Sequence, residues 1–100
     1  MAHVISLAEQ ARFPSGQILM TAGIDDLVRH GRINPTPYLL RHLAGDWGDL
    51  SDHDRQLNDA ALKSGADRLF SSYQITPDLK LWIITEWDRS VTTLLLPSEY

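Results

Sequence analysis

The chain has 100 residues, no cysteine, and a formal net charge of −4 from 9 basic and 13 acidic residues. A single domain of this length buries about two thirds of its surface, so we expect an ordinary hydrophobic core. The absence of cysteine excludes disulfides, thiolate metal sites and cysteine nucleophiles. The few, scattered cations argue against direct binding of duplex DNA.

The first residues, MAHVISLAEQARF, lack the basic segment and apolar run of a secretory signal peptide. No stretch reaches the ~20 apolar residues that a membrane span needs. We therefore expect a cytoplasmic protein with no membrane partner. Residues 1–16 show no periodicity and end in the turn signal FPSG, so they are predicted to form a mobile or loosely packed arm. Residues 17–100 are predicted to form a single domain.

The first predicted elements are a short strand and a helix. Residues 17–20, QILM, can form the strand. Thr21 is a suitable cap for a helix over residues 22–31, which Gly31 would end. One face of this helix carries its apolar residues, Ile24, Leu27 and Val28.

Two more helices are predicted next. One begins after Asn34, with two prolines in its first turn, and runs to Gly45. Its apolar stripe consists of Leu39, Leu40 and Leu43. Another begins at Ser51, which with Asp54 resembles a capping box, and ends at Gly65. Its narrow inward face is expected to consist of Leu57, Ala60 and Ala61.

The last third of the chain has the pattern of strands. Residues 68–75, 80–87 and 91–96 are rich in β-branched and aromatic residues, and residues 76–79 and 88–90 are turns. The middle run is apolar on both faces, so it should be the central strand. The predicted fold is α+β: a short strand, three helices, then a three-stranded antiparallel meander with the helices packed on one face.

The densest group of candidate functional residues is residues 41–54, RHLAGDWGDLSDHD. Helix caps and a turn explain most of it, and Trp47 is expected to pack under the connection. His42 is left over as either a core residue with satisfied hydrogen bonds or a general base. No metal-ligand spacing and no phosphate-binding glycine loop occurs, so we predict no metal and no cofactor.

A second group lies in residues 85–93, TEWDRSVTT. Turn and strand chemistry accounts for these residue types. However, Arg89, Ser90 and Thr92 would place a cation and hydroxyls at one end of the sheet. With a helix histidine nearby, such groups could hold a phosphodiester and its developing charge. Trp87 is expected to be exposed.

Three stretches, PYLLRHLAGDWGDL, SSYQI and WIITEWDRSVTTLLLPSEY, resemble a family of short proteins carried on plasmids and other bacterial mobile elements. Members are often labelled type I restriction endonuclease subunit M or plasmid-related protein, and the family has no established activity. The chain is too short for a methyltransferase and lacks its cofactor loop. The resemblance therefore implies a setting, in which small accessory proteins often counter host defences by binding a CRISPR or restriction complex.

We predict a small acidic accessory protein that acts by binding another protein, such as an anti-CRISPR or anti-restriction inhibitor of a host defence complex. The predicted contact residues are Asp46, Trp47, Asp49, Asp52, Asp54 and Trp87.

Two alternatives stay open. A loose likeness in fold to the barnase, colicin and RelE group implies a metal-independent RNase. His42 would be its base and Arg89 its phosphate clamp, while Ser90 or Thr92 would supply a hydroxyl. The other alternative is a structural or regulatory module that forms a homodimer through an exposed edge of its sheet.

Overall fold

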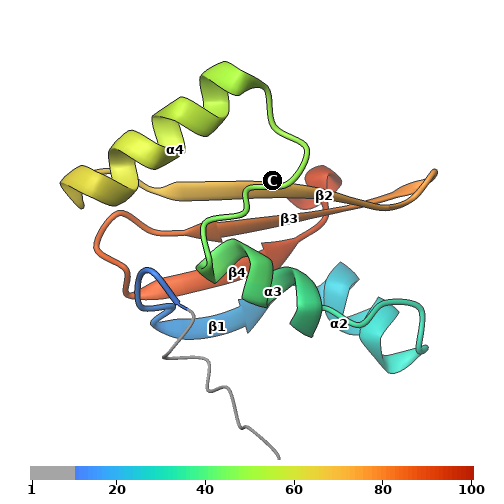
Figure 1. Cartoon of the computed structure of the whole chain (residues 1–100). Helices are drawn as coiled ribbons and strands as arrows, with labels where there is room; N and C mark the ends of the chain where they lie inside the picture. Colours follow the sequence, from blue (N-terminus) through green and yellow to red (C-terminus); the bar gives the residue numbers. More distant parts are fainter. Residues whose placement is uncertain (1–10) are drawn as a thin grey trace, which may run out of the picture.

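The computed structural model describes residues 11–100 and confirms the predicted α+β class (Figure 1). Within these residues, no helix is long and apolar enough to cross a bilayer. The elements follow the predicted order: β1 (Gln17–Met20), α2 (Ala22–Arg29), α3 (Thr36–Leu43), α4 (Asp52–Ser64), β2 (Leu69–Thr76), β3 (Leu79–Thr85), β4 (Val91–Leu95) and a short 3-10 helix, η1 (Pro97–Glu99).

The sheet has the order β1-β4-β3-β2 and is mixed rather than purely antiparallel. Strands β2, β3 and β4 form the predicted antiparallel meander, with β3 inside the sheet. Strand β1 adds to it in parallel beside β4, with Ile18 opposite Thr92. A parallel pair needs a long crossover connection, which the helices and the other two strands supply here.

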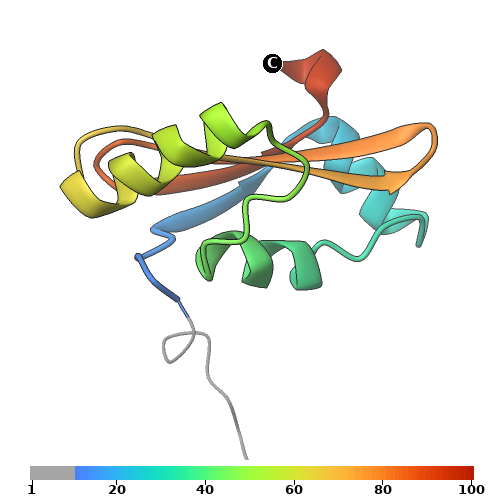
Figure 2. The same ribbon diagram turned by 45° about the horizontal axis from the view of Figure 1, so that its top comes forward.

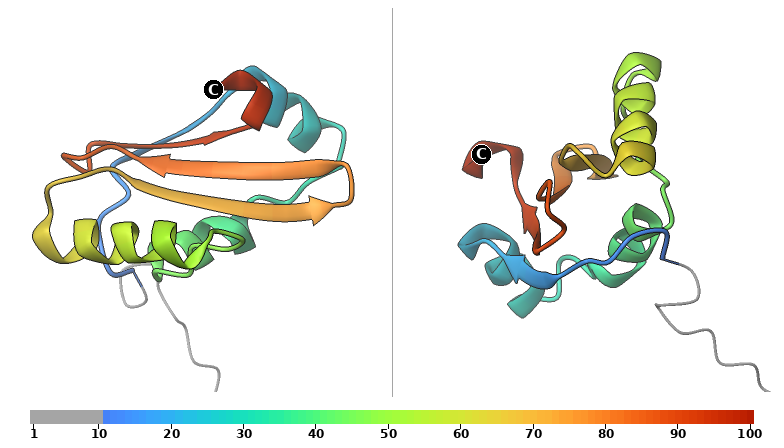
Figure 3. Two further views of the ribbon diagram at one scale, coloured as in Figure 1. Left: turned by 90° about the horizontal axis from the view of Figure 1, so that it is seen from above. Right: turned by 90° about the vertical axis from the view of Figure 1, so that its left-hand side faces the viewer.

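The three helices bury their apolar residues against one face of the sheet. Ile24 of α2 packs with Ile83 and Leu94, while Leu43 of α3 and Ala61 of α4 pack with side chains that include Leu69. Figure 3 shows α3 and α4 on the same side of the strands and η1 on the opposite side.

The inward side of α4 differs from the prediction. Ala61 is buried, but its buried companion is Asn58, and Leu57 is 56% exposed. Asn58 turns inward because its amide matches the edge of β2. Its Nδ2 donates to the carbonyl of Phe70 (2.6 Å), and its Oδ1 accepts from the Phe70 N–H (3.1 Å).

The segment before α4 closes the same edge further along (Figure 2). The Trp47 carbonyl accepts a hydrogen bond from the Ser72 N–H, and the Asp49 N–H donates to the Ser72 carbonyl (2.7 Å). Gly48 lies between them at φ +76°, where a Cβ would stand 2.1 Å from the Ser72 oxygen, so only glycine fits. The Asp49 carboxylate then accepts from the Gln74 N–H (2.8 Å).

The helix ends agree with the predicted caps in one case and differ in another. Ser51 accepts from the Asp54 N–H, and Gly65 ends α4 at φ +70°. At the start of α2, Thr21 makes no side-chain cap and donates instead to Glu99 (2.5 Å). Glu99 also accepts from the Gly23 N–H, so the end of the chain supplies the carboxylate at this helix N-terminus.

The predicted arm includes residues 11–16, but these pack against the domain. Phe13 is buried in the core beside Leu43 and Trp47, and the Arg12 N–H donates to the Leu43 carbonyl (2.8 Å). An aromatic side chain of this size buries enough apolar surface to order the segment around it. The remaining residues of the predicted arm, 1–10, lie outside the described residues.

Replacing Asn58 should destabilise the fold more than its size suggests. The Asn58→Ala variant leaves both backbone groups of Phe70 without their partner, which should lower the free energy of unfolding by about 2 kcal/mol. The neighbouring, exposed Gln56→Ala should change it by less than about 0.5 kcal/mol. Urea denaturation of both variants measures the difference, and equal midpoints would contradict this role for Asn58.

Candidate functional site

His42 lies at the centre of a buried chain of hydrogen bonds. Its side chain is 0% exposed, with Nδ1 at 2.5 Å from Ser71 Oγ and Nε2 at 2.9 Å from Thr85 Oγ1. Thr85 Oγ1 lies 2.7 Å from Thr92 Oγ1, which donates to the carbonyl of Ser15 (2.7 Å). The chain joins α3, all three strands of the meander and the segment before β1.

The order of donors in this chain of hydrogen bonds determines the tautomer of the His42 imidazole. A hydroxyl has one proton to donate, and Thr92 gives its proton to a carbonyl, so Thr85 must donate to Thr92. Thr85 then accepts from His42 Nε2–H, and Nδ1 accepts from Ser71. Burial lowers the pKa of His42 to about 3, so the ring is neutral at physiological pH.

Arg89 is occupied by backbone carbonyls. It has φ +60° at the β3–β4 turn, and its guanidinium donates to the carbonyls of Asp67 (2.6 Å) and, at the end of α4, Ala61 (3.2 Å). It also donates to two carbonyls of its own turn. Ser90 donates to the Asp88 carboxylate, which holds the pKa of that carboxyl below its ordinary value. Arg89 therefore ties the turn to the end of α4.

The residues of the RNase hypothesis are thus not assembled around an open site. Both nitrogens of His42 are hydrogen-bonded in the core, and the Phe13 ring contacts both His42 (ring centroids 5.4 Å apart) and the Arg89 guanidinium (6.0 Å from the centroid). Thr92 is fully buried in the same chain. A general base must reach the proton that it removes, so the geometry gives the RNase hypothesis no support.

The four predicted acidic contacts divide into two pairs. Asp46 accepts from Arg41 Nε (2.7 Å), which holds the pKa of Asp46 below its ordinary value, and Asp49 closes the β2 edge. Asp52 and Asp54 lie exposed in the first turn of α4. The second pair remains available to a partner.

The two predicted tryptophan contacts also differ. Trp47 is buried beside Phe13 and donates its indole N–H to Asp59 (2.9 Å), so it supports the loop and does not form contact surface. This position corrects its inclusion among the contact residues and agrees with its expected packing under the connection. Trp87 is 63% exposed in the β3–β4 turn, as predicted.

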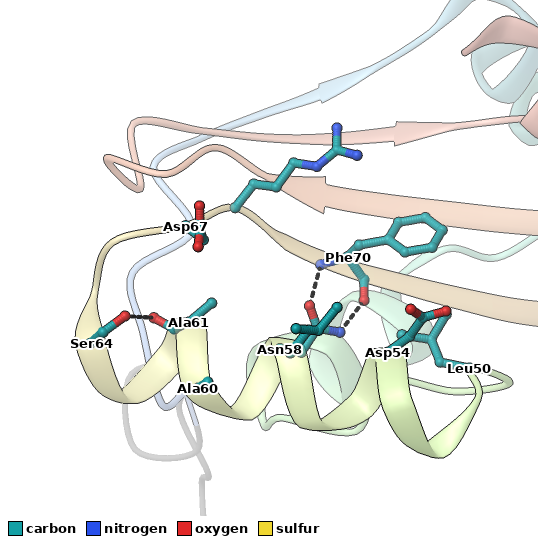
Figure 4. Close-up of a pocket in the computed structure, with 10 residues that line it drawn as sticks. Leu50, Asp54, Asn58, Ala60, Ala61, Ser64, Asp67 and Phe70 are labelled. Carbon is teal, nitrogen blue, oxygen red and sulfur yellow. Dashed lines mark hydrogen bonds between the residues drawn. The ribbon is translucent and has the colours of Figure 1, made fainter.

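A groove of about 590 Å³ runs between α4 and β2 (Figure 4). Asp54 and Leu50 lie at one end of it and Ser64 and Asp67 at the other. Between these residues the lining is mostly apolar. The full set is Leu50, Asp54, Leu57, Asn58, Ala60, Ala61, Ser64, Asp67, Arg68 and Phe70.

Beside the groove, aromatic rings cover part of the sheet face opposite the helices. The Trp82 ring meets Phe70 and Tyr100 edge to face, with centroids 5.0 and 5.7 Å away. Arg68 donates to the Tyr100 hydroxyl (2.7 Å) and lies over its ring. Because Arg68 and Phe70 also line the groove, the two surfaces are continuous.

Sequence reasoning missed the groove because it placed Leu57 and Ala60 inside. Both are exposed in the structure. Asn58 is the residue that could have indicated the groove, because asparagine is unfavourable in the interior of a helix unless its side chain makes a specific hydrogen bond.

Comparison of the chain with family models, curated proteins and solved structures finds no significant match. The resemblance to the mobile-element proteins therefore stays a prediction. Among residues 11–100, no group of three or more metal-ligating side chains is present.

Burial of neutral His42 should make stability depend on pH. The pKa is about 3 in the folded protein and near 6.5 when unfolded, so only the unfolded chain binds this proton between those values. The contribution of neutral His42 to the free energy of unfolding is complete above pH 6.5. Below that pH, the free energy of unfolding falls by about 1.4 kcal/mol for each pH unit. Between pH 7 and 4.5, wild type should therefore lose about 2–3 kcal/mol more than His42→Gln.

Urea denaturation of both proteins at the two pH values measures this difference. The exposed His53→Gln variant on α4 is the matched control and should follow wild type. The structural role of His42 would be refuted by a His42→Gln variant with the pH dependence of wild type.

Proposed function

We propose that this chain is a small acidic accessory protein of a mobile genetic element that acts by binding another protein. The observation that carries the proposal is the open groove between α4 and β2, with exposed Leu57 in its wall and a carboxylate at each end. The buried position of His42 and the carbonyl contacts of Arg89 support a binding role in place of catalysis.

The lining of the groove defines the chemistry of its occupant. Leu57, Ala60 and Phe70 offer apolar contacts, and Asp54 and Asp67 lie near the opposite ends. The one cation of the lining, Arg68, donates to the Tyr100 hydroxyl beside the groove. The stretch of α4 between Asp54 and Ser64 is ~15 Å long, at 1.5 Å per residue. A short segment of a partner protein, with an apolar side chain between basic ones, would complement this surface in both shape and charge.

The charge of the chain favours partners with a basic surface. The net charge is −4, and Asp52 and Asp54 are exposed in the first turn of α4. Within residues 11–100 neither carboxylate forms a salt bridge, because Arg55 of the same turn donates to the carbonyls of Leu50 and Gly48. Complexes that hold nucleic acid carry cationic surfaces. A host restriction or CRISPR complex therefore fits as the partner, in agreement with the setting that the sequence resemblance implies.

Substitution of Leu57 should weaken binding of the partner without harming the fold. Leu57→Asp places a charge in the groove wall, whereas Leu40→Asp changes an exposed leucine on α3, which is 37% exposed and lies outside the groove. The binding of the two variants and of wild type is compared by affinity capture from bacteria that carry a restriction or CRISPR complex. We expect wild type and Leu40→Asp to retain that complex, and Leu57→Asp to lose at least about tenfold in affinity.

The same three proteins should then be measured against the purified complex at low and high salt. Binding should weaken with salt, because part of it is between exposed charges. Capture of no complex by wild type, or equal affinity of Leu57→Asp and wild type, would overturn the proposal.

A further inference from the structure

The two edges of the sheet differ in whether their outward backbone groups have hydrogen-bond partners. The β2 edge is closed from Phe70 to Gln74 by the Asn58 side chain and the segment around Gly48. The other edge is β1, and no part of residues 11–100 pairs with its outer side. Figure 3 shows β1 at the margin of the molecule, away from α4.

The outer side of β1 presents unpaired backbone groups. On its inner side, the Gln17 N–H donates to the Ser90 carbonyl and the Thr21 N–H to the Leu94 carbonyl. Backbone groups alternate in direction along a strand. The N–H and C=O groups of Ile18 and Met20 therefore point away from the sheet.

The side chains of this edge are apolar and uncharged. Ile18, Leu19 and Met20 are each 42% exposed. No charged residue occurs between Arg12 and Asp25 in a chain whose net charge is −4. Sheet edges are usually protected by charges, proline or a covering segment, and the described residues give this edge none of these.

We propose that β1 pairs with β1 of a second copy, in an antiparallel arrangement about a two-fold axis. The charge distribution favours this occupant, because a neutral strand can meet its own copy without bringing like charges together. A basic partner would instead be drawn to the acidic surfaces elsewhere. A two-fold contact uses the same patch on both copies, as most homodimers do.

The backbone directions define the register of this pairing. With the axis at Leu19, the outward groups of Ile18 meet those of Met20 in the second copy and exchange hydrogen bonds with them. Leu19 then faces Leu19 of the second copy in a pair without hydrogen bonds, with Cβ atoms about 5 Å apart. The two sheets become one continuous sheet, and the α4 grooves stay free at its far ends.

Sedimentation velocity on the purified full chain tests the proposal. Wild type should reach twice its mass of 11.3 kDa as the concentration rises. Ile18→Pro removes an outward N–H and spares the bonds to β4, since proline is tolerated at the open side of an edge strand. Ile18→Pro and Met20→Lys should each raise the dissociation constant at least about tenfold. Leu40→Lys and the groove variant Leu57→Asp should dimerise like wild type.

The register has its own test, because the chain has no cysteine. Under mild oxidation, Leu19→Cys should form a disulfide-linked dimer far faster than Leu40→Cys, which lies on α3. The proposal would be overturned by monomeric wild type at every concentration, or by dimers that Met20→Lys and Ile18→Pro leave intact. Equal cross-linking of the two cysteine variants would overturn the register.

Discussion

A chain of hydrogen bonds from Ser71 through His42, Thr85 and Thr92 to the Ser15 carbonyl holds the interior of the domain together. It gives every buried polar group along its path a partner, and it ties α3 and the segment before β1 to the meander. An unpaired buried polar group costs about 1–3 kcal/mol, so loss of one member affects the others. The histidine that resembles a catalytic base in the sequence is thus an internal support.

With the interior occupied in this way, the two proposed binding surfaces lie at the two margins of the sheet. At the β2 margin, Asn58 turns inward to pair with Phe70, which leaves Leu57 exposed and opens the groove. At the β1 margin, the described residues leave the backbone uncovered. Because the margins are opposite, a dimer formed through β1 would carry two separate grooves, and the two proposals can fail independently.

Local signals explain which parts of the fold were predictable. The N-cap Ser51 and the C-cap Gly65 specify the ends of α4 through contacts within a few residues. The β-branched runs specify the meander because each strand pairs with the next one along the chain. The parallel placement of β1 and the inward turn of Asn58 depend on contacts distant in sequence. The partners of His42 lie 29 and 43 residues away, so no spacing could identify them. Arg89 has the residue type of a phosphate clamp, but backbone carbonyls occupy it.

His42 is a neutral, internal support of the fold, and this role directs the search for function to the surface. Imidazole nitrogen resonances recorded by NMR from pH 8 to 5 test it most directly. We expect His42 to stay neutral over this range, with its proton on Nε2. Titration of His42 near its ordinary value of 6.5, or a proton on Nδ1, would contradict the hydrogen-bond chain and reopen the case for acid–base chemistry at this residue.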